Sequence, residues 1–175
     1  QEQGNDVRAI RDILALGLPH PVNILFLYFI GFFILGLVLR INPWIAAAGA
    51  LAFGFSSYFL IIIEAGHVTK AYTIAFMAPV VAAFIMAYRR SLIWGVILSA
   101  FFMMMQIGSN HVQITYYLGF LLAAIGVYEL VRAIKQKTYK RFVIATVGIV
   151  FAYGLAAMSS AANLMGTMEY AKETI

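Results

Sequence analysis

The fold is decided by residues 56–76, Ser-Ser-Tyr-Phe-Leu-Ile-Ile-Ile-Glu-Ala-Gly-His-Val-Thr-Lys-Ala-Tyr-Thr-Ile-Ala-Phe. Apolar residues dominate both ends of this segment, and its middle carries a carboxylate, an imidazole and an ammonium group: Glu64, His67 and Lys70. Ionisable groups are costly in hydrocarbon, so at the end of apolar segments they mark an aqueous mouth or a binding site. The segment therefore predicts two membrane helices joined by a polar turn.

Composition places the chain among integral membrane proteins. Of its 175 residues, 63% are hydrophobic and only 11% are charged, whereas charged residues make up about 25% of a soluble domain. This length accommodates about six apolar helices of roughly 20 residues. The absence of cysteine excludes disulfides and thiolate metal ligands. The net charge of +5 does not indicate nucleic-acid binding, because the basic residues lie between apolar segments, where they set membrane topology.

The predicted fold is an all-α, polytopic membrane helix bundle of about six transmembrane helices, preceded by a short interfacial amphipathic helix. We expect an outward polar segment with this helix in residues 1–21, the bundle in 22–161, and an outward C-terminal segment in 162–175. The chain begins at Gln1 without a Met, and we expect it to be a fragment of a larger protein. The expected spans are 22–39, 44–63, 71–88, 92–107, 114–130 and 142–158. In the amphipathic helix, expected between Val7 and Leu18, one apolar face contains Val7, Ile10, Ile13, Leu14 and Leu18.

Basic residues are divided unequally between the two ends of the predicted bundle. The loops at 40–43, 88–91 and 129–141 contain eight basic residues and one acid, whereas the opposite end has four basic residues and six acids. The positive-inside rule places these loops in the cytoplasm. Both ends of the chain and the polar turns at 64–70 and 108–113 are then expected on the outer side.

The two polar turns are similar in sequence. When His67-Val68 is aligned with His111-Val112, Tyr72 falls on Tyr116 and Phe76 on Phe120, an offset of 44 residues that is either an internal repeat or a chance match. We expect both turns to face one outer cavity. The candidate substrate-binding residues are Glu64, His67, Lys70, Asn110, His111, Gln113 and Tyr116.

Each candidate also has a structural interpretation. Glu64 and Lys70 could form a salt bridge across Gly66, and Lys70 could extend to the membrane interface. The polar residues His67, Asn110, His111 and Gln113 could satisfy loop backbone groups, and Tyr116 could belong to an aromatic belt. A metal site of His67, His111 and Glu64 is an alternative, although their spacing has no recognised signature.

Several motifs resemble those of the YfhO-type bacterial membrane protein family, in its Bacteroidetes-like version. They are Gly-Leu-Pro-His-Pro-Val-Asn (17–23), Asn-Pro-Trp (42–44), Phe-Ser-Ser-Tyr (55–58), Ile-Glu-Ala-Gly-His-Val-Thr-Lys-Ala (63–71), Asn-His-Val-Gln-Ile-Thr-Tyr-Tyr (110–117) and the segment 163–174. The resemblance implies a polytopic GT-C-like glycosyltransferase of the bacterial inner membrane. Such an enzyme transfers a sugar from a polyprenyl-phosphate donor to an envelope glycopolymer or lipid on the outer face, and a divalent metal is compatible with this chemistry.

The resemblance also implies that the catalytic acid or base lies outside this chain. In enzymes of this kind the acidic residue lies in the first outer loop, and this chain is expected to begin beyond that loop. Asp6 and Asp12 match no family motif and are not assigned the role. Two other function classes remain open: a lipid or solute transporter, or flippase, and a non-catalytic membrane scaffold.

Overall fold

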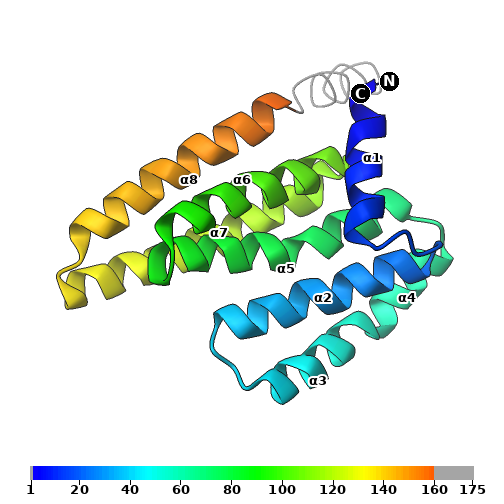
Figure 1. Ribbon diagram of the computed structural model, residues 1–175, viewed down its shortest axis with the longest axis horizontal. Helices are drawn as coiled ribbons and strands as arrows, with labels where there is room; N and C mark the ends of the chain where they lie inside the picture. Colours follow the sequence, from blue (N-terminus) through cyan, green and yellow to red (C-terminus); the bar gives the residue numbers. More distant parts are fainter. Residues whose placement is uncertain (1, 160–175) are drawn as a thin grey trace.

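The computed structural model describes residues 2–159, which form eight α-helices and no strand (Figure 1). The all-α prediction is confirmed, and each predicted apolar segment is helical. The helices are α1 (Glu2–Leu14), α2 (Val22–Val38), α3 (Pro43–Gly54), α4 (Ser57–Glu64), α5 (Val68–Arg89), α6 (Leu92–Gly108), α7 (Val112–Gln136) and α8 (Tyr139–Ser159).

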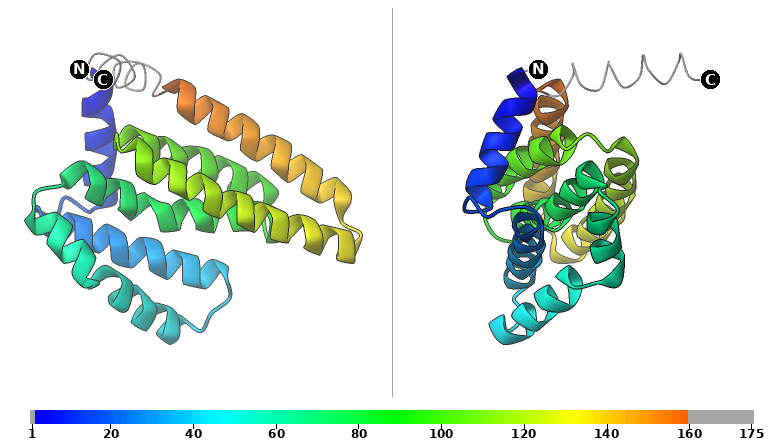
Figure 2. Two further views of the ribbon diagram at one scale, coloured as in Figure 1. Left: turned by 180° about the vertical axis from the view of Figure 1, so that it is seen from behind. Right: turned by 90° about the vertical axis from the view of Figure 1, so that its right-hand side faces the viewer.

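Helix α5 lies at the centre of the bundle. Of its most apolar 18-residue window, 89% is buried, compared with 22% for the corresponding windows of α7 and α8. Helices α2, α6, α7 and α8 pack around α5, and α3 packs on the far side of α2 (Figures 1 and 2). An apolar sequence on every face suits this position, because α5 has packing partners all round.

The structure has fewer candidate membrane spans than the six predicted. Helices α5, α7 and α8 are long and apolar enough to cross a membrane, and α3 with α4 would add a fourth as one bent span. Helices α2 and α6 are apolar but have 17 residues each. That length corresponds to about 26 Å, whereas the hydrocarbon core of a bilayer is about 30 Å thick. The helices are thus compatible with a membrane protein, with spans of unequal length.

The segment predicted as one span at 44–63 is two helices that differ in direction by 44°. Helix α3 begins where the Asn42 side chain accepts a hydrogen bond of 2.9 Å from the backbone N–H of Trp44. It ends at Gly54, and α4 begins after Ser56, whose ψ of 131° is extended. The Ser56 side chain makes no capping hydrogen bond, so the new helix direction is set by the extended backbone of this residue.

Helix α1 runs across one end of the bundle, next to the turn between α6 and α7 (Figures 1 and 2). It begins and ends earlier than the predicted helix at Val7–Leu18. Val7 packs near Gly108, but Ile13 is 74% exposed, so the predicted apolar face is only partly buried. The reason is that only one side of α1 contacts the bundle.

At the other end of the bundle, hydrogen bonds connect the basic loops at 88–91 and 129–141 with each other and with the last turn of α2. Arg90 donates to the carbonyl of Leu37 at 3.0 Å, which connects α5 to α2, and Arg141 donates to the carbonyl of Arg90 at 2.8 Å. Arg89 donates to Glu129 at 2.6 Å, which connects α5 to α7. The polar turns at 64–70 and 108–113 therefore lie at the opposite end, beside α1.

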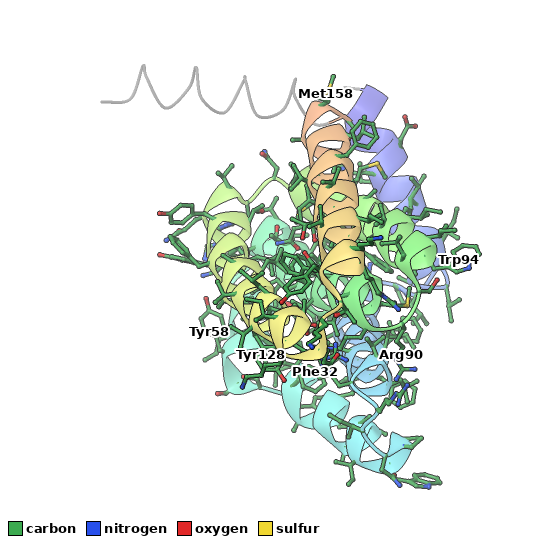
Figure 3. All side chains as sticks on the ribbon, turned by 90° about the vertical axis from the view of Figure 1, so that its left-hand side faces the viewer. Phe32, Tyr58, Arg90, Trp94, Tyr128 and Met158 are labelled. Atoms are coloured by element: carbon green, nitrogen blue, oxygen red, sulfur yellow. The ribbon has the colours of Figure 1, made fainter. Side chains whose placement is uncertain are left out.

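Much of the outer surface of the bundle is apolar. On α8, for example, Val147 is 63% and Phe151 is 67% exposed. Trp94 of α6 and Met158 of α8 also project outward (Figure 3). Such a surface is typical of helices that contact lipid or other apolar helices.

Candidate functional site

An apolar cavity of about 530 Å³ lies between α2, α3, α4, α5 and α7. Two of its lining residues, Phe32 of α2 and Tyr58 of α4, are visible on the α7 side of the molecule in Figure 3. Its apolar walls are formed by Phe32, Leu35, Phe53, Phe59, Ile74, Met77, Ala78, Val81, Ile114 and Leu121. Its polar lining residues are Tyr58, Lys70, His111, Gln113 and Tyr117. We call this space the apolar cavity.

The polar residues of the apolar cavity come from the two polar turns and the helix ends beside them. The Nζ atom of Lys70 lies 5.1 Å from the ring centroid of Tyr58, within the range of a cation–π contact. Gln113 donates a hydrogen bond of 3.2 Å to the hydroxyl of Tyr117. The Nδ1 atom of His111 is shielded from solvent and has no hydrogen-bond partner among the described residues. An unpaired buried polar atom is costly, so this nitrogen is one for which the described side chains supply no partner.

The two turns have the same local backbone design. Gly66 and Asn110 adopt left-handed conformations, with φ of 74° and 57°, and each is followed by a histidine that precedes a helix. This agrees with the aligned His-Val pairs. The helices that follow occupy different environments, however: Tyr72 is 3% exposed on central α5, whereas the aligned Tyr116 is 62% exposed on peripheral α7.

The structure divides the seven candidate residues between different places. Lys70, His111 and Gln113 line the apolar cavity. Asn110 lines a second cavity, between α1, α5 and the α6–α7 turn, and Tyr116 lies in a shallow hollow with Ile107, Val112 and Thr115. Glu64 and His67 are exposed and line none of these three spaces. The expected joint cavity therefore contains only part of the predicted set.

The structure does not contain the salt bridge or the metal site that the sequence left open. Glu64, the last residue of α4, makes no ion pair with Lys70, and the ion pairs between side chains of the described part of the chain all involve Glu129. Within residues 2–159, no group of three or more His, Asp or Glu residues is placed to hold a metal ion. Glu64 is thus not in position to orient the Lys70 ammonium.

Sequence reasoning missed two polar residues of the apolar cavity, Tyr58 and Tyr117. Both lie in motifs quoted above, Phe-Ser-Ser-Tyr (55–58) and Asn-His-Val-Gln-Ile-Thr-Tyr-Tyr (110–117), and Tyr117 directly follows the candidate Tyr116. Tyr58 was visible as a polar-tipped residue beside Ser56 and Ser57, and Tyr117 as the neighbour of Tyr116. The missing information was the side of each helix that faces the cavity.

Comparison with known proteins gives no match to a family model, a curated protein or a solved structure. The functional argument therefore rests on the geometry of the cavities and on the motifs quoted above.

Proposed function

We propose that the apolar cavity binds the lipid carrier of a polyprenyl-phosphate-linked sugar, as part of a glycosyltransferase-like protein of the bacterial inner membrane. The acceptor would be an envelope glycan or lipid. One observation carries the proposal: the cavity has long apolar walls and a single charged residue, Lys70, among the described residues that line it. An amphiphile with one anionic group and a long hydrocarbon chain complements such a space.

The two parts of this ligand have separate partners. The isoprenoid chain would contact the aromatic and aliphatic walls, where close packing provides the attraction, because the chain is already surrounded by hydrocarbon before it binds. The phosphate would lie near Lys70, whose ammonium group acts as a point charge, and near the unpaired Nδ1 of His111. The side-chain amide of Gln113 and the hydroxyl of Tyr117 are further polar groups for the phosphate or the sugar.

The position of Lys70 suits the departure of a phosphate leaving group. When the bond between sugar and phosphate breaks, negative charge grows on the phosphate oxygen, and a fixed ammonium nearby stabilises the transition state more than the ground state. No general base is assigned, because none of the cavity residues is a carboxylate. The acceptor hydroxyl would need such a base from outside the cavity.

Lys70→Ala is expected to lower sugar transfer at least about tenfold, because the ammonium is the only fixed charge offered to the phosphate by the described cavity residues. The assay is transfer from a lipid-linked sugar in membranes that contain the full-length protein. Glu64→Gln is the matched control: Glu64 belongs to the same turn but does not line the cavity, so its substitution should have a much milder effect. Unchanged transfer by Lys70→Ala would contradict the phosphate role.

The proposal places the polar turns on the outer side of the membrane, with all six apolar segments, short α2 and α6 included, within the bilayer. A cysteine at Val68, the first residue of α5, should react with a membrane-impermeant thiol reagent in whole cells. A cysteine at Thr138, among the basic residues between α7 and α8, should resist the reagent until the cells are opened. The chain has no cysteine of its own, so each label reports one position. The reverse labelling pattern would overturn this orientation.

A transporter or flippase is the second candidate, because the apolar cavity is bordered by the broken pair α3 and α4. Discontinuous helices beside a binding site are a recurrent feature of transporters. Vesicles separate the two functions. Wild-type protein that moves the lipid carrier across the bilayer without consuming the sugar donor would favour transport over transfer.

A further inference from the structure

A second cavity, of about 400 Å³, lies between α1, the first turn of α5 and the turn from α6 to α7. We call it the arginine cavity, because α1 contributes Arg8 and Arg11 to its lining. Thr69 lines this cavity, whereas the next residue, Lys70, lines the apolar cavity. The first turn of α5 therefore separates the two spaces, and they share no lining residue.

The side chain of Arg11 is held in place by a chain of contacts. Its guanidinium carbon lies 3.6 Å from the ring centroid of Tyr72, which is a close cation–π contact. The hydroxyl of Tyr72 accepts a hydrogen bond of 2.7 Å from the side-chain amide of buried Asn23 on α2. The Nε–H group of Arg11 is shielded from solvent and has no hydrogen-bond partner among the described residues. The contact with Tyr72 thus holds the guanidinium group in place without using its Nε–H as a hydrogen-bond donor.

The positive charge of the arginine cavity has no carboxylate counterpart in the described side chains. Asp6 and Asp12 on α1 are exposed, and neither forms an ion pair with Arg8 or Arg11. At the other end of the bundle, in contrast, Arg89 and Arg132 are both paired with the carboxylate of Glu129. Two arginines in one cavity that form no ion pair with a described carboxylate are typical of a site for an anion.

The start of α5 adds to this positive potential. Helix α5 has 22 residues, and its capping residue, His67, makes no side-chain hydrogen bond to the first turn. The N-terminus of a helix carries a partial positive charge and offers free backbone N–H groups to anions. Thr69 belongs to this turn and lines the cavity. The start of α5 and the arginine side chains favour an anion, and the C-terminus of α6, where Gly108 and Ser109 line the same cavity, offsets part of the effect of the α5 end.

We propose that the arginine cavity binds a phosphate group, carried by a phospholipid headgroup or by a soluble phosphate compound. Guanidinium groups match phosphate oxygens in geometry and bind them with paired hydrogen bonds. The cavity is bounded by α1, which crosses the end of the bundle. An anion bound there would connect α1 to the first turn of α5 and to the turn between α6 and α7. The proposal is independent of the function proposed for the apolar cavity, because it uses none of its residues.

Calorimetric titration of the purified full chain in a maltoside detergent tests this proposal with two probes, inorganic phosphate and dihexanoyl phosphatidic acid. Wild-type protein is expected to bind at least one probe, and Arg8→Gln combined with Arg11→Gln should weaken that binding tenfold or more. The control is Arg40→Gln, which removes an exposed arginine at the opposite end of the bundle and should leave the affinity unchanged. Similar affinities for both probes would identify phosphate as sufficient, whereas binding of the lipid alone would identify a headgroup site.

Two further variants make the outcome decisive. Arg11 packs on Tyr72, so its substitution also removes a structural contact, but Arg8 is exposed, and Arg8→Gln alone should fold normally and still weaken binding severalfold. The titrations are repeated in the Lys70→Ala background, where a phosphate bound beside Lys70 in the apolar cavity no longer contributes, and the loss of binding caused by Arg8→Gln should persist there. Absence of binding by wild-type protein, or an affinity that Arg8→Gln does not alter, would overturn the proposal.

Discussion

Replacement of Gly95 by alanine is expected to lower the free energy of unfolding by about 3 kcal/mol or more, at the upper end of the usual cost of overpacking. Gly95 lies on α6, where the helix meets Ala87 of α5. An added Cβ atom would overlap the backbone nitrogen of Ala87 and lie 2.7 Å from its Cβ atom. A helix backbone cannot turn aside as a flexible side chain can, so α5 and α6 would have to separate. Because α5 is the centre of the bundle, this separation would disturb its packing with the other helices.

Gly154→Ala on α8 is the matched control for this experiment. An added Cβ atom there meets no other atom within 4 Å, and alanine is favoured over glycine inside helices by roughly 0.5–1 kcal/mol. Reversible unfolding in mixed micelles, followed by circular dichroism, gives the free energy for each variant. We expect Gly95→Ala to unfold at much lower denaturant concentration and Gly154→Ala to unfold at the wild-type concentration or above. Equal stability of the two variants would contradict the close packing of α5 on α6.

The sequence predicted the helical segments well because long apolar runs bounded by polar turns are a strong signal. It predicted more membrane spans than the structure supports, because two of the expected apolar segments form short helices and a third is broken. Helix α2 ends with Val38, only two residues before Arg40, and α6 ends at Gly108 before a polar turn, so both stay at 17 residues. The break between α3 and α4 falls within a continuous apolar run, where Ser56-Ser57 was the only local signal. A mean hydropathy taken over the length of a span does not detect two small polar residues within it.

The candidate site was predictable only as a region. Polar residues at the two turns indicated the correct end of the bundle for Lys70, His111 and Gln113, because apolar helices of similar length bring alternate turns together. Sequence spacing could not decide which side chains enter the cavity. Tyr116 and Tyr117 are neighbours, but successive residues of a helix point about 100° apart. Packing of α7 against α5 turns Tyr117 toward the apolar cavity and leaves Tyr116 outside it.

Glu129 shows how a residue counted only for its charge can have a packing role. It is the single acid in the three loops that contain eight basic residues. In the structure its side chain is 3% exposed, and its two carboxylate oxygens accept hydrogen bonds from Arg89 at 2.6 Å and from Arg132 at 3.1 Å. One carboxylate thus joins the end of α5 to α7.

Glu129→Ala is accordingly expected to lower the free energy of unfolding by roughly 2–3 kcal/mol, because it leaves two guanidinium groups without their shared partner. The cost stays below that of a fully buried pair, since the side chains of Arg89 and Arg132 are 29% and 33% exposed and retain contact with water. Glu129→Gln keeps the shape and one acceptor oxygen and should cost less. The same micelle unfolding assay measures both variants, with Lys135→Gln as the control for a change of charge at an exposed site on α7.

Because removal of the acid makes the basic end more positive, a cysteine at Thr138 should remain protected from the impermeant thiol reagent in the Glu129→Ala background, as in the wild-type background. A loss of stability with unchanged topology would assign the carboxylate to packing between α5 and α7, whereas wild-type stability of Glu129→Ala would show that the basic loops hold together without it.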